Sequence, residues 1–200
     1  MPIQQVLNDK VVTLNTLVND NTLPSQQLGR ELFNFYVNGW GDEPRYIKPT
    51  LPGDFLRNKN GIFGQEQNRY EMFAQYVLDL LRTRNLGIFL NAFLTNITDP
   101  HNNIAPNNIK IARYANGWYI GTFFLTIKYP SEYLWIFKYK NNKNALINLN
   151  LANSNQVNFF KATPFNTQPY FDLMNQLQEH GNYNGNFSNL LNYIESNYIE

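Results

Sequence analysis

The segment IKIARYANGWYIGTFFLTIKYP, residues 109–130, decides the predicted fold. Asn116-Gly117 is the residue pair that favours a two-residue β-hairpin turn, because both positions of such a turn need a positive φ. We therefore expect antiparallel strands over 109–115 and 118–128. Pro130 ends the second strand, since proline cannot donate a hydrogen bond to a sheet ladder.

The residues that follow favour more strands. Residues 133–139 are rich in aromatic and β-branched side chains, and 145–151 alternate between apolar residues and Asn. A fifth strand over 157–162 follows an Asn-rich turn. Because the connections are short, neighbouring strands are expected to be antiparallel. Residues 109–162 thus predict an antiparallel β-meander of four to five strands.

Helical spacing of apolar residues dominates on both sides of this meander. Pro24 and Gly39 bracket a second helix, and Pro169 suits the first turn of a later one. We expect a single α+β domain over residues 1–200, in which N-terminal helices and two C-terminal helices flank the meander. The helical parts are 1–37, 65–95 and 169–200.

Residues 38–64 are predicted to form a long ordered loop. Glycine and proline recur through this stretch, which is longer than an ordinary connection, and long loops of this kind are often functional. Its aromatic residues favour order because they seek burial. Trp40, Arg45 and Tyr46 are therefore candidate partner-binding residues.

Charge is separated along the chain although the formal net charge is only +1. The predicted meander holds seven Lys or Arg residues and the single acid Glu132, whereas residues 164–200 hold acids and no Lys or Arg. Lys138 and Lys140 are therefore further candidate partner-binding residues. Opposite poles favour association with other copies or with partners of opposite charge.

Few residue patterns support catalysis. Cysteine is absent, which excludes disulfides and thiolate chemistry, and only His101 and His180 occur. We expect no metal, no cofactor and no enzymatic activity. The enzyme alternative would require Asp42, Glu43, Asp54 or His101 to converge in one pocket.

The chain shows no signal-peptide pattern, and its longest apolar runs are too short to span a bilayer. We therefore expect no membrane contact, and a location in a virion or in the host cytoplasm.

Low charge with many Asn and aromatic residues is typical of contact surfaces. We expect a non-enzymatic structural component of a larger assembly, of the neck, tail or baseplate type of a phage or virus particle. Its partners would be other protein subunits, in a homo- or hetero-oligomer. One alternative is a nucleic-acid-binding module that uses the basic aromatic sheet, with Trp118, Tyr133 or Trp135 stacking on bases. A second alternative is a secreted toxin or effector.

Overall fold

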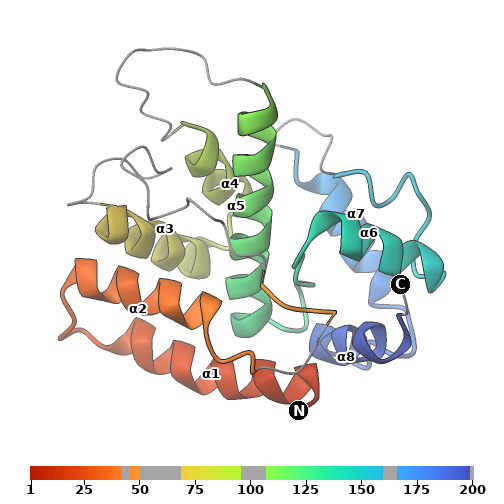
Figure 1. Ribbon diagram of the computed structural model, residues 1–200, viewed down its shortest axis with the longest axis horizontal. Coiled ribbons are helices and arrows are strands. Elements are labelled where there is room, and N and C mark those ends of the chain that lie inside the picture. The colour runs from red at the N-terminus through yellow and green to blue at the C-terminus, as the bar shows by residue number, and fades with distance from the viewer. Residues whose placement is uncertain (42–45, 50–68, 96–106, 160–165, 199–200) are drawn as a thin grey trace.

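One long helix, α5, forms the centre of the molecule (Figure 1). The computed structural model describes residues 1–41, 46–49, 69–95, 107–159 and 166–198. Helices α1 to α4 lie on one side of α5, and α6 to α8 lie on the other. The eight helices of these described ranges are α1 (Ile3–Asn19), α2 (Ser25–Val37), α3 (Arg69–Thr83), α4 (Leu86–Thr95), α5 (Asn107–Lys128), α6 (Tyr139–Asn148), α7 (Gln168–Leu177) and α8 (Phe187–Asn197).

The predicted α+β class and its β-meander are wrong. Helix α5 continues unbroken through Asn116-Gly117, and the described ranges contain no strand. Helix α6 covers residue 139 of the strand predicted at 133–139 and residues 145–148 of the strand predicted at 145–151. Periodicity cannot tell a helix from a strand in residues 117–127, because a helix that is buried on every side is as continuously apolar as a buried strand.

Burial on all sides explains why α5 is helical despite its many β-branched and aromatic residues. Every residue of 117–127 is buried, and α1, α3 and α4 all contact this helix. Gly121 permits the closest of these contacts, since a Cβ there would lie 2.9 Å from a ring carbon of Phe89 in α4. Tertiary packing thus outweighs the local preference for a strand.

Residues 133–137 are buried but form no strand, although the sequence predicts one over 133–139, and no neighbouring segment pairs with them in the described part of the chain. Side chains satisfy their backbone groups instead. Thr126 Oγ1 donates to the Tyr133 carbonyl at 3.0 Å, and Tyr170 Oη donates to the Leu134 carbonyl at 2.8 Å.

The backbone groups of Trp135 and Ile136 also form hydrogen bonds with side chains. The Ile136 amide donates to Thr122 Oγ1 at 2.9 Å, and Asn142 Nδ2 donates to the Trp135 carbonyl at 3.1 Å. Because buried backbone groups need partners, these side chains replace the ladder of a sheet.

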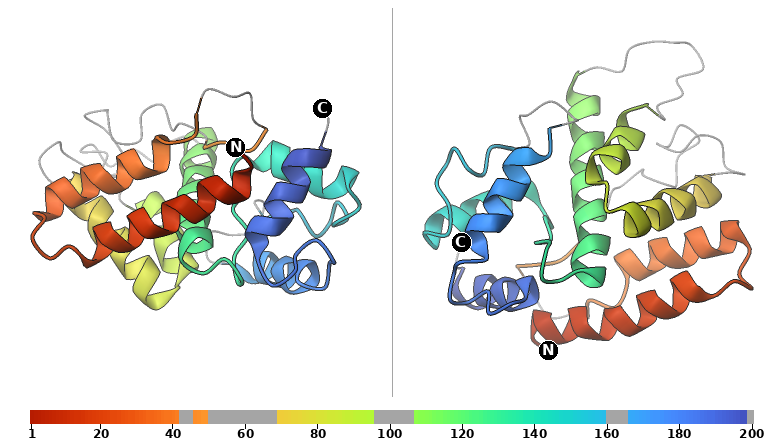
Figure 2. Two further views of the ribbon diagram at one scale, coloured as in Figure 1. Left: turned by 90° about the horizontal axis from the view of Figure 1, so that it is seen from below. Right: turned by 180° about the vertical axis from the view of Figure 1, so that it is seen from behind.

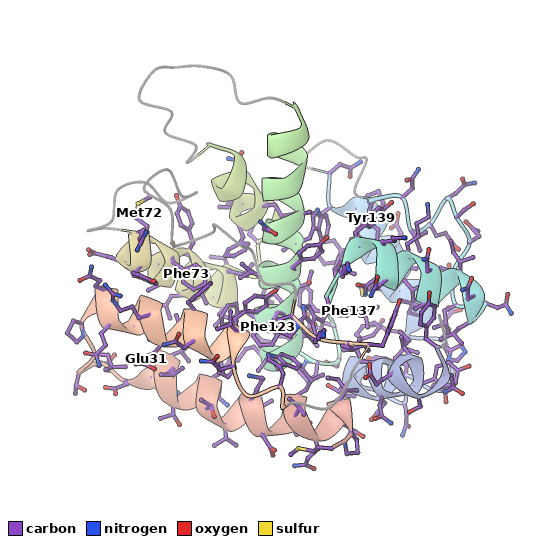
Figure 3. All side chains as sticks on the ribbon, viewed as in Figure 1. Glu31, Met72, Phe73, Phe123, Phe137 and Tyr139 are labelled. Carbon is purple, nitrogen blue, oxygen red and sulfur yellow. The ribbon has the colours of Figure 1, made fainter. Side chains whose placement is uncertain are left out.

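Aromatic side chains fill the space between the helices (Figure 3). Phe123 of α5 lies at the centre of this cluster, with its ring 5.1 Å from Tyr36, 5.3 Å from Trp135 and 6.0 Å from Trp40. Rings at such separations add to the stability that burial alone provides. The aromatic content of the sequence is therefore concentrated in the core.

The remaining helices lie where helical spacing predicted them: α1 to α4 within 1–37 and 65–95, and α7 and α8 within 169–200 apart from the first residue of α7. Of the predicted loop, only residues 38–41 and 46–49 belong to the described ranges. Within those ranges, no helix combines the length and hydrophobicity that a bilayer span requires. The start of α1 contacts α8, which brings the two ends of the described chain together (Figure 2).

Candidate functional site

Trp40 belongs to the core of the described residues, and its expected role in partner binding stays a prediction. Its side chain is only 8% exposed, its ring lies 5.0 Å from that of Trp135, and its Nε1 donates to the Tyr36 carbonyl at 2.9 Å. Substitution of a side chain that is buried in this way is expected to reduce the stability of the folded protein.

Tyr46 is half-buried and fastens its segment to the C-terminal helices. Its hydroxyl donates to the Asn141 carbonyl at 2.6 Å, and its ring lies 4.2 Å from that of Tyr198. The Glu195 carboxylate accepts hydrogen bonds from the Tyr46 and Ile47 amides at 3.0 and 2.6 Å. Tyr46 is therefore placed for packing, while Arg45 lies outside the described residues.

Lys138 and Lys140 are exposed, as a contact role requires. They lie at the start of α6, and Lys143 follows one turn later on the same face as Lys140. We call Lys138, Lys140 and Lys143 the lysine ridge. Neither Lys138 nor Lys140 forms an ion pair with any described residue.

Lys10 of α1 is a buried cation, which lies on the same face of the helix as the buried residues Val6, Leu7 and Leu14. Its Nζ donates to the carbonyls of Phe35 and Asn38 at 2.8 Å each, at the C-terminal end of α2. It also lies 4.7 Å from the ring centre of Phe35 and 4.9 Å from that of Trp40. Carbonyls of a helix C-terminus and aromatic faces both favour a cation. Burial nevertheless lowers the pKa of Lys10 to about 8.

This lowered pKa predicts that stability rises with pH. Between about pH 8 and the ordinary lysine value, the unfolded chain binds the Lys10 proton more strongly than the folded chain does. Below this range, the folded protein therefore carries the full free-energy cost of burying the charged Lys10 side chain. This cost decreases as the pH rises through the range. We expect the free energy of unfolding to rise from about pH 7 to about pH 9.5, relative to a Lys10→Met variant.

Urea unfolding of both proteins at matched pH values measures this difference. The range stops below pH 10 because burial raises the pKa of Tyr36 and Tyr170, so tyrosine ionisation then favours the unfolded chain. Parallel pH curves for the two proteins would contradict the lowered pKa of Lys10.

The best candidate for a ligand site is a groove between α1, α8 and the turn that precedes α8. Its volume is about 400 Å³, within the usual range for small-molecule sites. We call it the amide groove. Its lining residues are all uncharged, and most carry side-chain amides: Gln4, Gly181, Asn182, Asn184, Asn189, Asn192, Tyr193, Ser196 and Asn197.

Two features of the sequence build this groove. Residues 189, 192, 193, 196 and 197 share the outer face of α8, while Leu190, Leu191 and Ile194 are buried on the other face. In the turn, Asn184 and Gly185 have φ values of 42° and 75°, a region that Asn and Gly tolerate best. The turn is fastened by Tyr183, whose hydroxyl donates to the Ser131 carbonyl at 2.5 Å.

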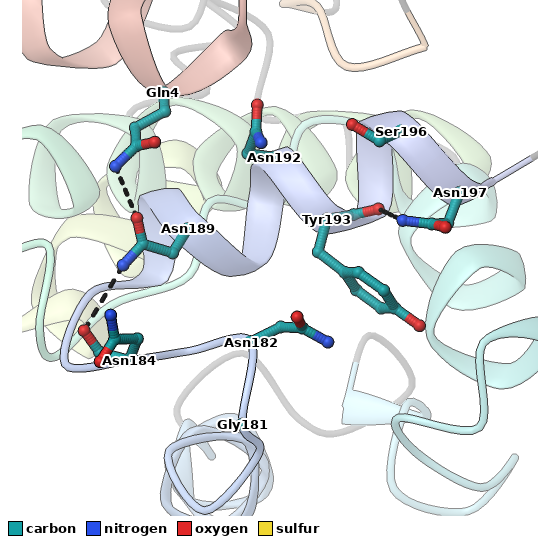
Figure 4. A pocket seen from close by; sticks show the side chains of 9 residues that line it. All are labelled: Gln4, Gly181, Asn182, Asn184, Asn189, Asn192, Tyr193, Ser196 and Asn197. Atoms are coloured by element: carbon teal, nitrogen blue, oxygen red, sulfur yellow. Dashed lines mark hydrogen bonds between the residues drawn. The ribbon is translucent and has the colours of Figure 1, made fainter.

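Asn189 closes one end of the amide groove (Figure 4). Its Oδ1 accepts from Gln4 Nε2 at 2.5 Å, and its Nδ2 donates to the Tyr183 carbonyl at 3.2 Å. This amide joins α1, α8 and the turn, so its role is structural. The side chains of Asn182, Asn192 and Ser196 also line the groove, and none has a hydrogen-bond partner among the described residues.

Sequence reasoning missed the amide groove because its parts lie far apart in the chain. Gln4 is the fourth residue, while the other lining residues lie between 181 and 197. One sequence pattern could have indicated the groove: on the outer face of α8, uncharged polar residues recur at helical spacing. An ordinary solvent-facing stripe usually carries charged residues.

The enzyme alternative depends on residues that the structure does not describe. Asp42, Glu43, Asp54 and His101 all lie outside the described residues, so their convergence stays untested. His180, the other histidine, stacks on Tyr193 with ring centres 5.8 Å apart, and its Nδ1 accepts from the Asn182 amide at 3.2 Å. Among the residues that the structure places, no three His, Asp or Glu side chains gather as metal ligands would.

The basic aromatic sheet of the nucleic-acid alternative does not exist in the described ranges. Trp118 and Trp135 are fully buried and Tyr133 is 4% exposed, so none of them can stack on a base. The residues that this alternative relied on stabilise the core.

The expected place in a phage or virus particle rests on composition, on the separation of charge along the chain and on the predicted long loop, and it stays a prediction. Comparison with known proteins adds nothing to it, because the chain matches no protein-family model, no curated protein and no solved structure.

Proposed function

We propose that this chain is a non-enzymatic component of a larger protein assembly, and that it docks through the lysine ridge onto an acidic surface of another subunit. The observation that carries this proposal is the exposure of Lys138 and Lys140 without a carboxylate partner among the described residues. Surface charges of this kind steer association and fix the orientation of the partner.

The lysine ridge stands on a firmly bound element, which supports a role in docking. The buried Asn142 side chain accepts from the Lys138 amide at 3.0 Å and donates to the Trp135 carbonyl. Tyr46 donates to the Asn141 carbonyl from the other side of the helix start. Because its backbone is held at several points, the ridge loses little freedom when it meets a partner.

The charge of α6 defines the partner. The helix carries Lys140 and Lys143 and no acidic residue, and Lys138 precedes it directly. The lysine ridge is therefore complementary to a surface that carries Asp or Glu side chains. A contact of this type depends on ionic strength, since salt screens exposed charges over about 10 Å at 0.1 M.

The chemistry of the amide groove also favours binding over turnover. Its lining contains no carboxylate, histidine, lysine or arginine, so the groove lacks the side chains that most often transfer protons in enzymes.

The test isolates the tagged full-length chain from its native source and measures the size of the complex by size-exclusion chromatography. We expect elution well above the 23.4 kDa of one chain. A Lys138→Glu/Lys140→Glu variant should be released as the single chain, because charge reversal repels an acidic partner. Added salt should release the unaltered chain as well.

Arg82→Glu provides the matched control, since it reverses a side chain of α3 that is 77% exposed and far from the lysine ridge in sequence. We expect this variant to remain in the complex. Elution of the unaltered chain as a monomer, or retention of the double variant in the complex, would contradict the proposal.

A further inference from the structure

We infer that the amide groove is a binding site for a neutral saccharide of about disaccharide size. This inference does not depend on the lysine ridge, because the groove lies between α1, α8 and the turn before α8, whereas the ridge lies on α6. It rests on the hydrogen-bonding groups of the groove, on its lack of charge and on its one aromatic side chain.

The unused hydrogen-bonding groups match those of a saccharide. Asn182 and Asn192 each present one carbonyl oxygen and one NH2 group, and Ser196 presents a hydroxyl, with no partner among the described residues. Gln4 uses its Nε2 on Asn189 and leaves its Oε1 towards the groove. Sugar hydroxyls both donate and accept, so they can pair with both ends of an amide.

Tyr193 supplies the apolar element that saccharide sites need. Its side chain lines the groove, and Figure 4 shows it projecting from α8 on the same side as Asn182 of the turn. The His180 ring lies beside the Tyr193 ring, with ring centres 5.8 Å apart and an interplanar angle of 38°. A ring in this position can pack against the C–H face of a pyranose while its hydroxyl remains a hydrogen-bonding group.

The lack of charge excludes the main competing ligand classes. Phosphate and nucleic acid are bound mainly through Lys and Arg side chains, and the lining contains neither of these. A protein partner is usually held by several Trp, Tyr or Arg side chains that cluster at the centre of the contact, and Tyr193 is the single residue of these types in the lining. A neutral, hydroxyl-rich ligand fits the remaining chemistry.

The abundance of Asn in the chain does not account for this lining. Asn makes up 33 of the 200 residues, or about one in six, but it supplies five of the nine residues of the groove. The single charged residue of α8, Glu195, is turned away to bind the Tyr46 and Ile47 amides. The groove therefore concentrates amides beyond the average of the chain and excludes charge.

The test is a titration of the 15N-labelled full-length protein with maltose, cellobiose, lactose and N,N′-diacetylchitobiose, followed by amide chemical shifts. We expect saturable shifts at residues of the turn 181–186 and of α8 with at least one of these disaccharides. Asn182→Ala and Asn192→Ala should each weaken that affinity about tenfold, because each removes hydrogen bonds that the ligand cannot replace.

Asn175→Ala is the matched control, since Asn175 is an exposed amide of α7 outside the groove. It should leave the affinity unchanged, and glucose 6-phosphate should bind no more tightly than glucose. Three outcomes would overturn the inference: no saturable binding by any of the four disaccharides, equal weakening by Asn175→Ala, or affinity that survives both groove substitutions.

Discussion

Replacement of Trp40 by alanine should destabilise the protein by about 3–5 kcal/mol, the usual range for removing a large aromatic side chain from a core. The side chain is 8% exposed, and its ring packs against Trp135 at 5.0 Å and Phe123 at 6.0 Å. Its loss also removes one of the aromatic faces beside the Lys10 ammonium group. Both effects act on the folded state.

Urea unfolding followed by circular dichroism measures this loss. Val12→Ala is the control, because Val12 of α1 is 70% exposed and its truncation should change stability by less than about 0.5 kcal/mol. If Trp40→Ala unfolded at the same urea concentration as the unaltered chain, the core position of Trp40 would be wrong.

Gly29→Ala should cost about 3 kcal/mol, although alanine is the better helix former. Gly29 is buried in α2 where this helix crosses α3, and a Cβ there would lie 1.8 Å from the carbonyl oxygen of Tyr70. Because that oxygen belongs to the backbone of α3, it cannot rotate away as a side chain can. The two helices must separate, which loosens the contact between Phe33 and Phe73.

Thermal and urea unfolding of Gly29→Ala should show this loss beside Gly87→Ala as a matched helical control. At Gly87 of α4, the nearest atom to an added Cβ is a side-chain oxygen of Asn85 at 3.4 Å, so we expect unchanged or slightly higher stability. Equal stability of the two variants would contradict the close crossing of α2 and α3.

The amphipathic helices could be predicted from the sequence because each has one apolar face. In α1, for example, Ile3, Val6, Leu7 and Leu14 are buried at helical spacing, while Val12 is exposed. Helix α5 could not be predicted in this way, because residues 117–127 are buried on every side and carry no periodic signal. Local preferences then pointed to strands, and long-range packing decided otherwise.

The burial of residues 133–137 agrees with their apolar composition, but the strand predicted there is wrong. Aromatic and β-branched residues favour a strand only where a neighbouring strand can pair with them, and here side chains satisfy the backbone groups instead. Thr122 and Tyr170, which satisfy two of those groups, lie more than ten residues away on either side. The amide groove was hidden for the same reason, since only the fold brings Gln4 beside α8.

The central position of α5 has a consequence for synthesis of the protein on the ribosome. Part of the surface of α5 is covered by later residues, among them Trp135 and Tyr170, whose rings lie 5.3 Å from Phe123 and Trp118, respectively. Translation at about 5–20 residues per second leaves this side of the nascent helix uncovered for several seconds. The growing polypeptide therefore exposes the apolar side chains of this face of α5 before the residues that cover them have been made, which is the condition under which nascent chains are prone to aggregate.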